Sequence, residues 1–60
     1  MVSPIDIQKA LSGMDYPAGK DDIVSHAERN KAGDDVLNAL RGIEDRTYEG
    51  PSGVSSAVFD

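Results

Sequence analysis

His26 is the side chain of this sequence best suited to acid–base chemistry, since it is the only histidine. At helical spacing its neighbour is Asp22, four residues earlier. A general base needs a partner inside a pocket, and a zinc site needs further histidine, cysteine or carboxylate ligands. The sequence supplies no second histidine and no cysteine. We therefore interpret the pair as residues of a helix surface and predict no metal site there.

Two pairs of aspartates are the other candidates for chemistry, Asp21-Asp22 and Asp34-Asp35. A calcium loop needs alternating oxygen ligands, a central glycine and a closing glutamate over about 12 residues, and neither pair has them. Acidic residues in the first turn of a helix are stabilised by its dipole, so we interpret both pairs as helix starts. The serines and glycines form no nucleophile elbow and no phosphate-binding loop. The sequence thus predicts no enzyme, no cofactor and no catalytic residue.

Helices are predicted near both ends of the chain. The first begins with Ser3 as N-cap and Pro4 in the first turn, and we expect it to stop at Gly13. The last is a short helix that begins at Pro51, and a glycine and several serines lower its helix propensity. Because this helix is weak, we expect Phe59 to tether it to the core.

Two further helices are predicted in the middle of the chain, over residues 20–29 and 34–41. The acidic pairs lie at their starts, and Asp34 is expected to cap the second of them. Gly42 is predicted to end that helix in the left-handed conformation, with Ile43 folding back onto it. Residues 30–33, between the two helices, are read as a loop.

The fold class predicted from these segments is all-α, a compact bundle of three main helices plus a short C-terminal helix. Residues 14–19 and 44–50 are read as connectors, the second anchored by Tyr48, and residues 1–60 form a single small domain. The predicted core consists of Ile7, Ala10, Leu11, Ile23, Val24, Ala27, Val36, Leu37, Leu40, Ile43, Tyr48, Val54 and Val58.

Short motifs in a fixed order run along nearly the whole chain. They are Ser3-Pro4 with Ile7-Gln8-Lys9-Ala10-Leu11, Gly13-Met14-Asp15-Tyr16-Pro17, Lys20-Asp21-Asp22-Ile23-Val24 with His26-Ala27, Asp34-Asp35-Val36-Leu37 with Ala39-Leu40, and Asp45-Arg46-Thr47-Tyr48 followed by Pro51, Val54, Ser55 and Ala57. In this order and spacing the chain resembles a family of small proteins of unknown function found mainly in high-GC Gram-positive bacteria. The resemblance implies a compact helical domain and implies no activity, cofactor or catalytic residue. The sequence departs from the pattern at Gly19 and Gly50, where a serine or threonine cap would be usual.

The acidic balance of the chain narrows the classes of partner. Eleven Asp and Glu against six Lys and Arg give a net charge of −5. Phosphate contacts need lysine and arginine, so direct binding to nucleic acid or to an anionic membrane is not expected. No apolar run approaches the roughly 20 residues that span a bilayer, and no signal peptide is recognised. We expect a soluble, cytoplasmic protein.

The function we predict is non-enzymatic, that of a protein–protein interaction module or accessory subunit. The negative charge would steer the domain toward a larger protein with a basic surface, such as one bound to nucleic acid. A core of this size is too thin to cover every apolar side chain, and those left over are candidates for an interface. The candidates are Met1, Val2, Ile5, Met14, Tyr16, Tyr48 and Phe59.

Two other functions stay open at this point. Three short helices with a tight turn can form a helix-turn-helix, which would contact nucleic acid through Lys31, Asn38, Arg41 and Arg46. The aspartates at the start of the third helix count against this, because that end usually approaches the bases. The second alternative is a small homodimer, since a marginal domain gains stability by burying more surface.

Overall fold

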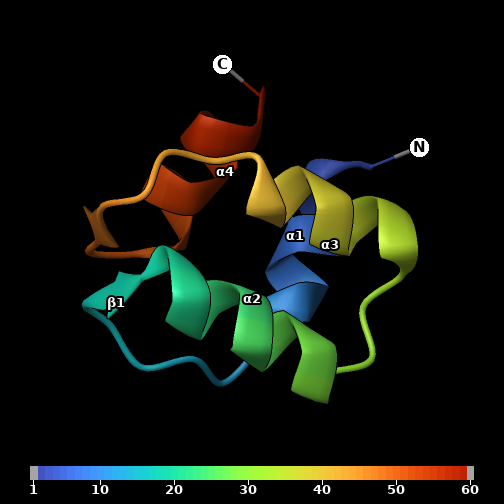
Figure 1. Ribbon diagram of the computed structural model, residues 1–60. Coiled ribbons are helices and arrows are strands. Elements are labelled where there is room, and N and C mark those ends of the chain that lie inside the picture. Colours follow the sequence, from blue (N-terminus) through green and yellow to red (C-terminus); the bar gives the residue numbers. More distant parts are fainter. Residues whose placement is uncertain (1, 60) are drawn as a thin grey trace.

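The computed structural model describes residues 2–59, and Met1 and Asp60 lie outside the described residues. Within this range, four helices and two short strands follow one another along the chain (Figure 1). Their bounds are α1 Pro4–Ala10, β1 Ala18–Gly19, α2 Lys20–Arg29, α3 Asp34–Arg41, β2 Thr47–Tyr48 and α4 Pro51–Phe59. The two central helices have the predicted bounds, and the last helix begins at the predicted proline.

A two-stranded antiparallel sheet is the feature that the all-α prediction missed. Ala18 pairs with Tyr48 and Gly19 with Thr47, so the sheet joins the two segments that were read as connectors. A strand of two residues is too short to show an alternating pattern, and its partner is distant in the sequence. The fold is therefore a mostly helical domain with a small sheet. A cis peptide bond precedes Pro17, just before β1.

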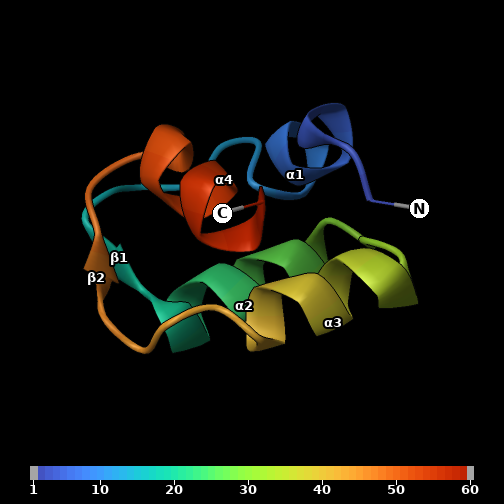
Figure 2. The ribbon, with the colours of Figure 1, turned by 90° about the horizontal axis from the view of Figure 1, so that it is seen from above.

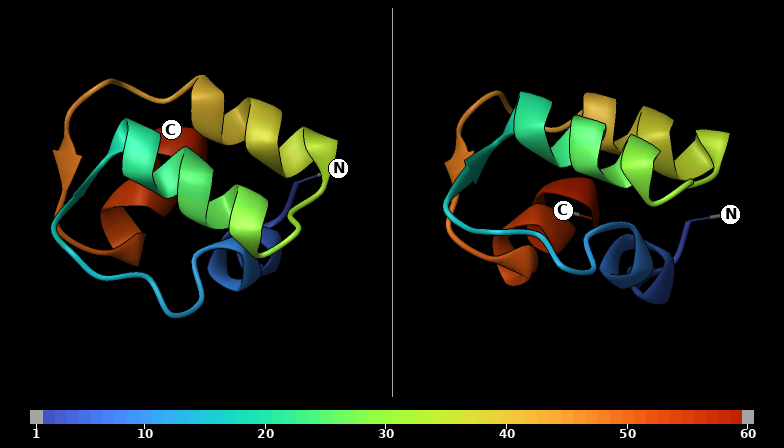
Figure 3. Two further views of the ribbon diagram at one scale, coloured as in Figure 1. Left: turned by 60° about the horizontal axis from the view of Figure 1, so that its bottom comes forward. Right: turned by 90° about the horizontal axis from the view of Figure 1, so that it is seen from below.

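The helices form two layers, which are separated clearly in the view from above (Figure 2). One layer holds α2 and α3 side by side, the other holds α1 and α4, and β1 and β2 close one end of the molecule (Figures 2 and 3). The first and last helices of the chain, α1 and α4, thus form one layer of the fold. The longest helix has ten residues, and no helix within residues 2–59 is long and apolar enough to cross a membrane.

The predicted N-cap of α1 is present. The Ser3 hydroxyl accepts a hydrogen bond from the Asp6 backbone N–H, and the Asp6 carboxylate accepts one from the Ser3 backbone N–H at 3.0 Å. These bonds favour the charged carboxylate and hold the pKa of Asp6 below its ordinary value. The helix ends at Ala10, earlier than predicted, and Gly13 lies in the turn that follows with a φ of 79°.

Glycines rather than acidic residues precede α2 and α3. Gly19 and Gly33 occupy the N-cap positions, so Asp34 is the first residue of α3 and not its cap. The acidic pairs lie in the first turns, where the helix dipole favours them. The predicted left-handed stop at Gly42 is wrong, because its φ of −87° and ψ of −5° lie in the right-handed region. Ile43 after it is buried, as predicted.

Serine at position 19 is expected to stabilise the protein. Gly19 has a φ of −86°, and a Cβ there would meet no atom within 4 Å, so Gly19→Ser adds a capping hydroxyl without strain. We expect the free energy of unfolding to rise by about 0.5 kcal/mol, from the cap and from a less flexible unfolded chain. Gly13→Ser is the matched control: the space is equally open but φ is positive, and stability should fall by about 1 kcal/mol. Urea titrations measure both, and a loss for Gly19→Ser would contradict the capping argument.

Buried apolar side chains from all six elements and the adjoining turns form one core. They are Ile7, Ala10, Leu11, Ala18, Ile23, Ala27, Val36, Leu40, Ile43, Tyr48 and Val54. Three residues predicted for the core are only half-buried, namely Val24, Leu37 and Val58. Ala18, which pairs with Tyr48 across the sheet, is also buried, and the sequence did not indicate this. Val54, fully buried, attaches α4, whereas the predicted tether Phe59 is 45% exposed.

Candidate functional site

His26 connects α2 to the end of α1. Its Nε2 lies 2.7 Å from the carbonyl oxygen of Ser12. Asn30 donates to the same carbonyl at 3.1 Å and to the Ala10 carbonyl at 2.9 Å. Both side chains therefore satisfy carbonyls at the C-terminal end of α1 that have no partner within that helix. No group of three histidine, aspartate or glutamate side chains within residues 2–59 lies close enough to hold a metal ion.

The side chains predicted to contact nucleic acid do not form one patch. Lys31 precedes α3 and takes a φ of 60°, whereas Arg41 ends α3 and donates to the Asn38 side-chain oxygen at 3.4 Å. Lys31 and Arg41 therefore lie at opposite ends of the helix. Arg46 lies beyond it, next to β2.

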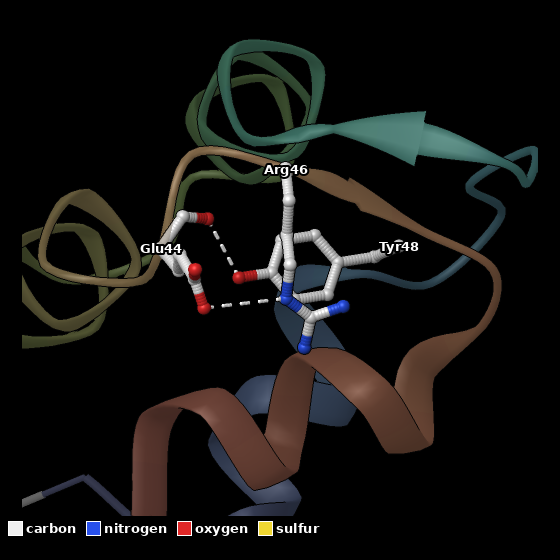
Figure 4. A network of polar contacts seen from close by, with 3 residues as sticks. All are labelled: Glu44, Arg46 and Tyr48. Atoms are coloured by element: carbon white, nitrogen blue, oxygen red, sulfur yellow. Dashed lines mark hydrogen bonds and ion pairs between the residues drawn. The ribbon is translucent and has the colours of Figure 1, made fainter.

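Arg46 is held in a structural network with Tyr48 and Glu44 (Figure 4). Its guanidinium carbon lies 4.2 Å from the centre of the Tyr48 ring, and its Nε lies 3.6 Å from a Glu44 carboxylate oxygen. The Tyr48 hydroxyl donates to the Glu44 carbonyl oxygen at 2.7 Å. A cation stacked on a ring and next to a carboxylate is less available to a phosphate.

The relation between α2 and α3 also differs from that of a helix-turn-helix. In such motifs the two helices cross at about 90–120°. Here α2 and α3 run side by side in opposite directions, joined by residues 30–33 (Figure 3). The pair is an antiparallel helical hairpin, which forms one layer of the fold.

A groove of about 780 Å³ lies between α1 and α4. Both walls show the i, i+3, i+4, i+7 spacing of a single helix face. The wall residues are Pro4, Ile7, Gln8 and Leu11 on one side and Ser52, Ser55, Ser56 and Phe59 on the other. Met14 and Tyr16, from the connector after α1, complete the apolar part of the lining, and no residue of the lining is charged. The volume lies within the range of about 300–1,000 Å³ that is typical of binding pockets.

The groove brings together three of the predicted interface residues, Met14, Tyr16 and Phe59. Ile5 is 61% exposed but does not belong to the groove lining. Tyr48 is 1% exposed, which confirms its place in the predicted core and removes it from the candidate interface, because the ring packs in the core between the sheet and α4. Val2 is half-buried against the core, and Met1 lies outside the described residues.

The family described as "Protein of unknown function (DUF2795)" matches residues 2–55 of the chain, which include most of the groove lining. The chain belongs to this family. Membership confirms the resemblance to a family of unknown function, and it assigns no activity to the groove. Neither the curated proteins nor the solved structures include a significant match to the chain.

The sequence analysis did not predict that α4 forms one wall of the groove. Ser52, Ser55 and Ser56 were read only as residues that weaken the helix, but they lie on one face with Phe59. Small side chains there leave the space that larger residues would fill. The signal that indicates such a wall is the i, i+3, i+4, i+7 spacing of the three serines and the phenylalanine, which is visible in the sequence.

Tyr16 presents its ring to the groove and hides its hydroxyl. The side chain is half-buried against the core, and its hydroxyl is buried with no hydrogen-bond partner among residues 2–59. Burial disfavours the phenolate and raises the pKa of Tyr16 above its ordinary value of 10.0. A buried hydroxyl without a partner costs stability, so this tyrosine is not optimal for the fold.

Tyr16→Phe is therefore expected to keep or increase stability, with a rise in the free energy of unfolding of up to about 1 kcal/mol at neutral pH. The folded state of the natural chain holds the Tyr16 proton more tightly than the unfolded state. The stability that comes from this tighter proton binding is present below the unfolded pKa and is lost as pH rises through the folded pKa. Tyr16→Phe has no proton there to lose, so its stability should not fall over this pH range for that reason. Urea titrations at neutral and alkaline pH test this. A destabilised variant would show that the hydroxyl has a partner after all.

Proposed function

We propose that the chain is a non-enzymatic protein-interaction domain that binds its partner in the groove between α1 and α4. The observation that carries the proposal is the groove itself, an uncharged hollow in a chain of which 28% of the residues are charged. Apolar and aromatic side chains that converge in a hollow are typical of binding sites. The proposed partner is a larger protein with a basic surface, and the proposed location is the bacterial cytoplasm.

Contact with nucleic acid is the weaker proposal for this domain. Its supporting cations lie apart, Arg46 is occupied by Glu44 and Tyr48, and the net charge is −5. The acidic first turn of α3 would meet the phosphates at the end of the helix that reads the bases. Binding of a protein partner in the groove does not depend on these cations or on a positive net charge.

Affinity capture from native lysate with groove variants tests the proposed function. Phe59 and Ile5 are matched probes, because both are large exposed apolar residues and only Phe59 lines the groove. We expect the natural chain and Ile5→Ser to capture the same protein in stoichiometric amount, with or without nuclease. Phe59→Ser should lose it while its circular dichroism spectrum is unchanged.

Two results would overturn the proposal. If capture disappears with nuclease, the association runs through nucleic acid. If Phe59→Ser captures the partner as well as Ile5→Ser does, the groove is not the binding surface. Sedimentation of the purified chain shows whether it associates with itself instead, in which case the homodimer replaces the proposal.

A further inference from the structure

A second hollow, of about 370 Å³, lies between the connector after α1 and one face of α2. The α2 residues that line it have the i, i+3, i+4, i+7 spacing of a single helix face. The lining of this α2 hollow consists of Met14, Asp15, Pro17 and Ala18 on one side and Asp22, Ser25, His26 and Arg29 on the other. We propose that the α2 hollow receives a lysine or arginine side chain of the partner protein, an assignment that rests on the proposed function.

Hydrogen-bond acceptors without partners gather in the α2 hollow. His26 Nε2 lies 2.7 Å from the Ser12 carbonyl oxygen, which can only accept, so Nε2 carries the proton. In the neutral ring Nδ1 is then an acceptor, and it has no hydrogen-bond partner among residues 2–59. Asp15 and Asp22 are exposed, and within the same range neither carboxylate forms an ion pair or a hydrogen bond. Ammonium and guanidinium groups only donate, so they complement this set of acceptors.

The two carboxylates lie toward the start of α2, and the arginine lies toward its end. Ser12 lies next to His26, and β1 immediately precedes α2, so the connector between them runs back along this helix. Asp15 belongs to the middle of that run. Arg29 is seven residues after Asp22, about 10 Å along the helix axis at 1.5 Å per residue. A bound cation therefore meets the carboxylates at one end of the hollow and is repelled from the other end.

Two simpler explanations do not account for this arrangement. The helix dipole favours Asp22 in the first turn of α2 and Arg29 in the last, but it has no bearing on Asp15, which lies outside every helix. A metal ion is not the occupant, because no three such ligands within residues 2–59 lie close enough to hold one. A side chain with several N–H donors can contact acceptors that a single ion cannot bridge.

The α2 hollow adjoins the groove between α1 and α4, since Met14 lines both. One partner surface can therefore place an apolar side chain in the groove and a basic side chain in the hollow. A second copy of this chain fits less well, because each copy carries a net charge of −5 and the two would repel each other. A partner with a basic surface is attracted by the same charge, and the hollow gives one of its cations a defined contact.

Two short capped peptides test the proposal, one with a single arginine and one with citrulline at the same position. Citrulline has nearly the shape of arginine and no charge. Each peptide is titrated into the full chain labelled with ¹⁵N, at millimolar concentration because exposed ion pairs are weak. We expect the arginine peptide to shift the amide signals of Asp15, Asp22 and His26, and the citrulline peptide to shift them much less. Added salt should reduce the shifts caused by the arginine peptide.

Variants with matched changes of charge locate the binding site. Asp15→Asn with Asp22→Asn should weaken binding of the arginine peptide roughly fivefold, as expected for two exposed ion pairs. Asp21→Asn with Glu28→Gln removes two exposed carboxylates of α2 that do not line the hollow, and it should leave the affinity unchanged. Arg29→Gln should increase the affinity, because it removes the like charge from the lining.

Equal shifts by the two peptides, or equal losses in the two double variants, would overturn the proposal, since only the overall charge would then matter. The proposed function would survive that result if lysate capture still depends on Phe59. If capture does not depend on Phe59, the proposed function fails even when the arginine peptide binds in the α2 hollow. The two experiments therefore distinguish the two failures.

Discussion

Tyr48→Ala is expected to leave the protein largely unfolded at room temperature. The ring is 1% exposed and lies against Gly53 of α4, where an added Cβ would come within 3.6 Å of it. Truncation of a buried aromatic residue costs about 3–5 kcal/mol, and a domain of this size has a stability of only about 3–5 kcal/mol. The cost is therefore comparable with the whole stability. Circular dichroism in water and in urea measures the folded fraction.

Tyr48→Phe separates the contribution of the Tyr48 ring to stability from that of its hydroxyl. It keeps the packing and removes only the hydrogen bond to the Glu44 carbonyl, so we expect a loss of about 1 kcal/mol. The effect has the opposite sign to that of Tyr16→Phe, because the Tyr16 hydroxyl has no partner among residues 2–59. A folded Tyr48→Ala variant with near-natural stability would show that the ring does not connect the sheet to α4.

Leu40→Ala is the second change expected to destabilise the domain severely. Leu40 is fully buried in the core, on the face of α3 that points into it. Removal of its side chain loses apolar burial and leaves a cavity, which together cost about 2–5 kcal/mol. Because alanine has the best helix propensity, α3 itself is not weakened by the change.

Leu37→Ala on the same helix is the matched control for Leu40→Ala. Leu37 is only half-buried, so the same chemical change should cost clearly less, about 1–2 kcal/mol. Urea titrations at constant temperature give both values. Equal losses at the two positions would mean that α3 does not pack as described, and that the layer formed by α2 and α3 needs a different arrangement.

These stability tests also define which variants can serve in binding experiments. Phe59 and Ile5 are exposed, so serine at either position removes little packing from the core. Changes at Ile7 or Leu11 are poor choices, since both line the groove and are also buried in the core. Loss of binding by such a variant would not distinguish a damaged groove from a damaged fold.

Local signals in the sequence determined the helices of this protein. Caps, glycines, prolines and the spacing of apolar residues act over one or two turns, so the bounds of α2 and α3 and the N-cap Ser3 were predicted correctly. The net charge and the lack of cysteine are likewise properties of the sequence alone, and they exclude classes of chemistry without any structure. Phe59 was predicted as an interface candidate because a thin core does not cover every apolar side chain.

Only the tertiary structure decided which segments of the chain contact one another. The pairing of β1 with β2 joins distant segments through backbone hydrogen bonds, which side-chain patterns of two residues do not report. That pairing buries Ala18 and Tyr48 and thereby sets the position of α4. The groove exists because α4 then lies opposite α1, with its serine face turned toward Ile7 and Leu11. A site formed by helices from opposite ends of a chain depends on long-range packing. Periodicity within one segment can indicate the face of one wall, but it does not show which helix lies opposite that face.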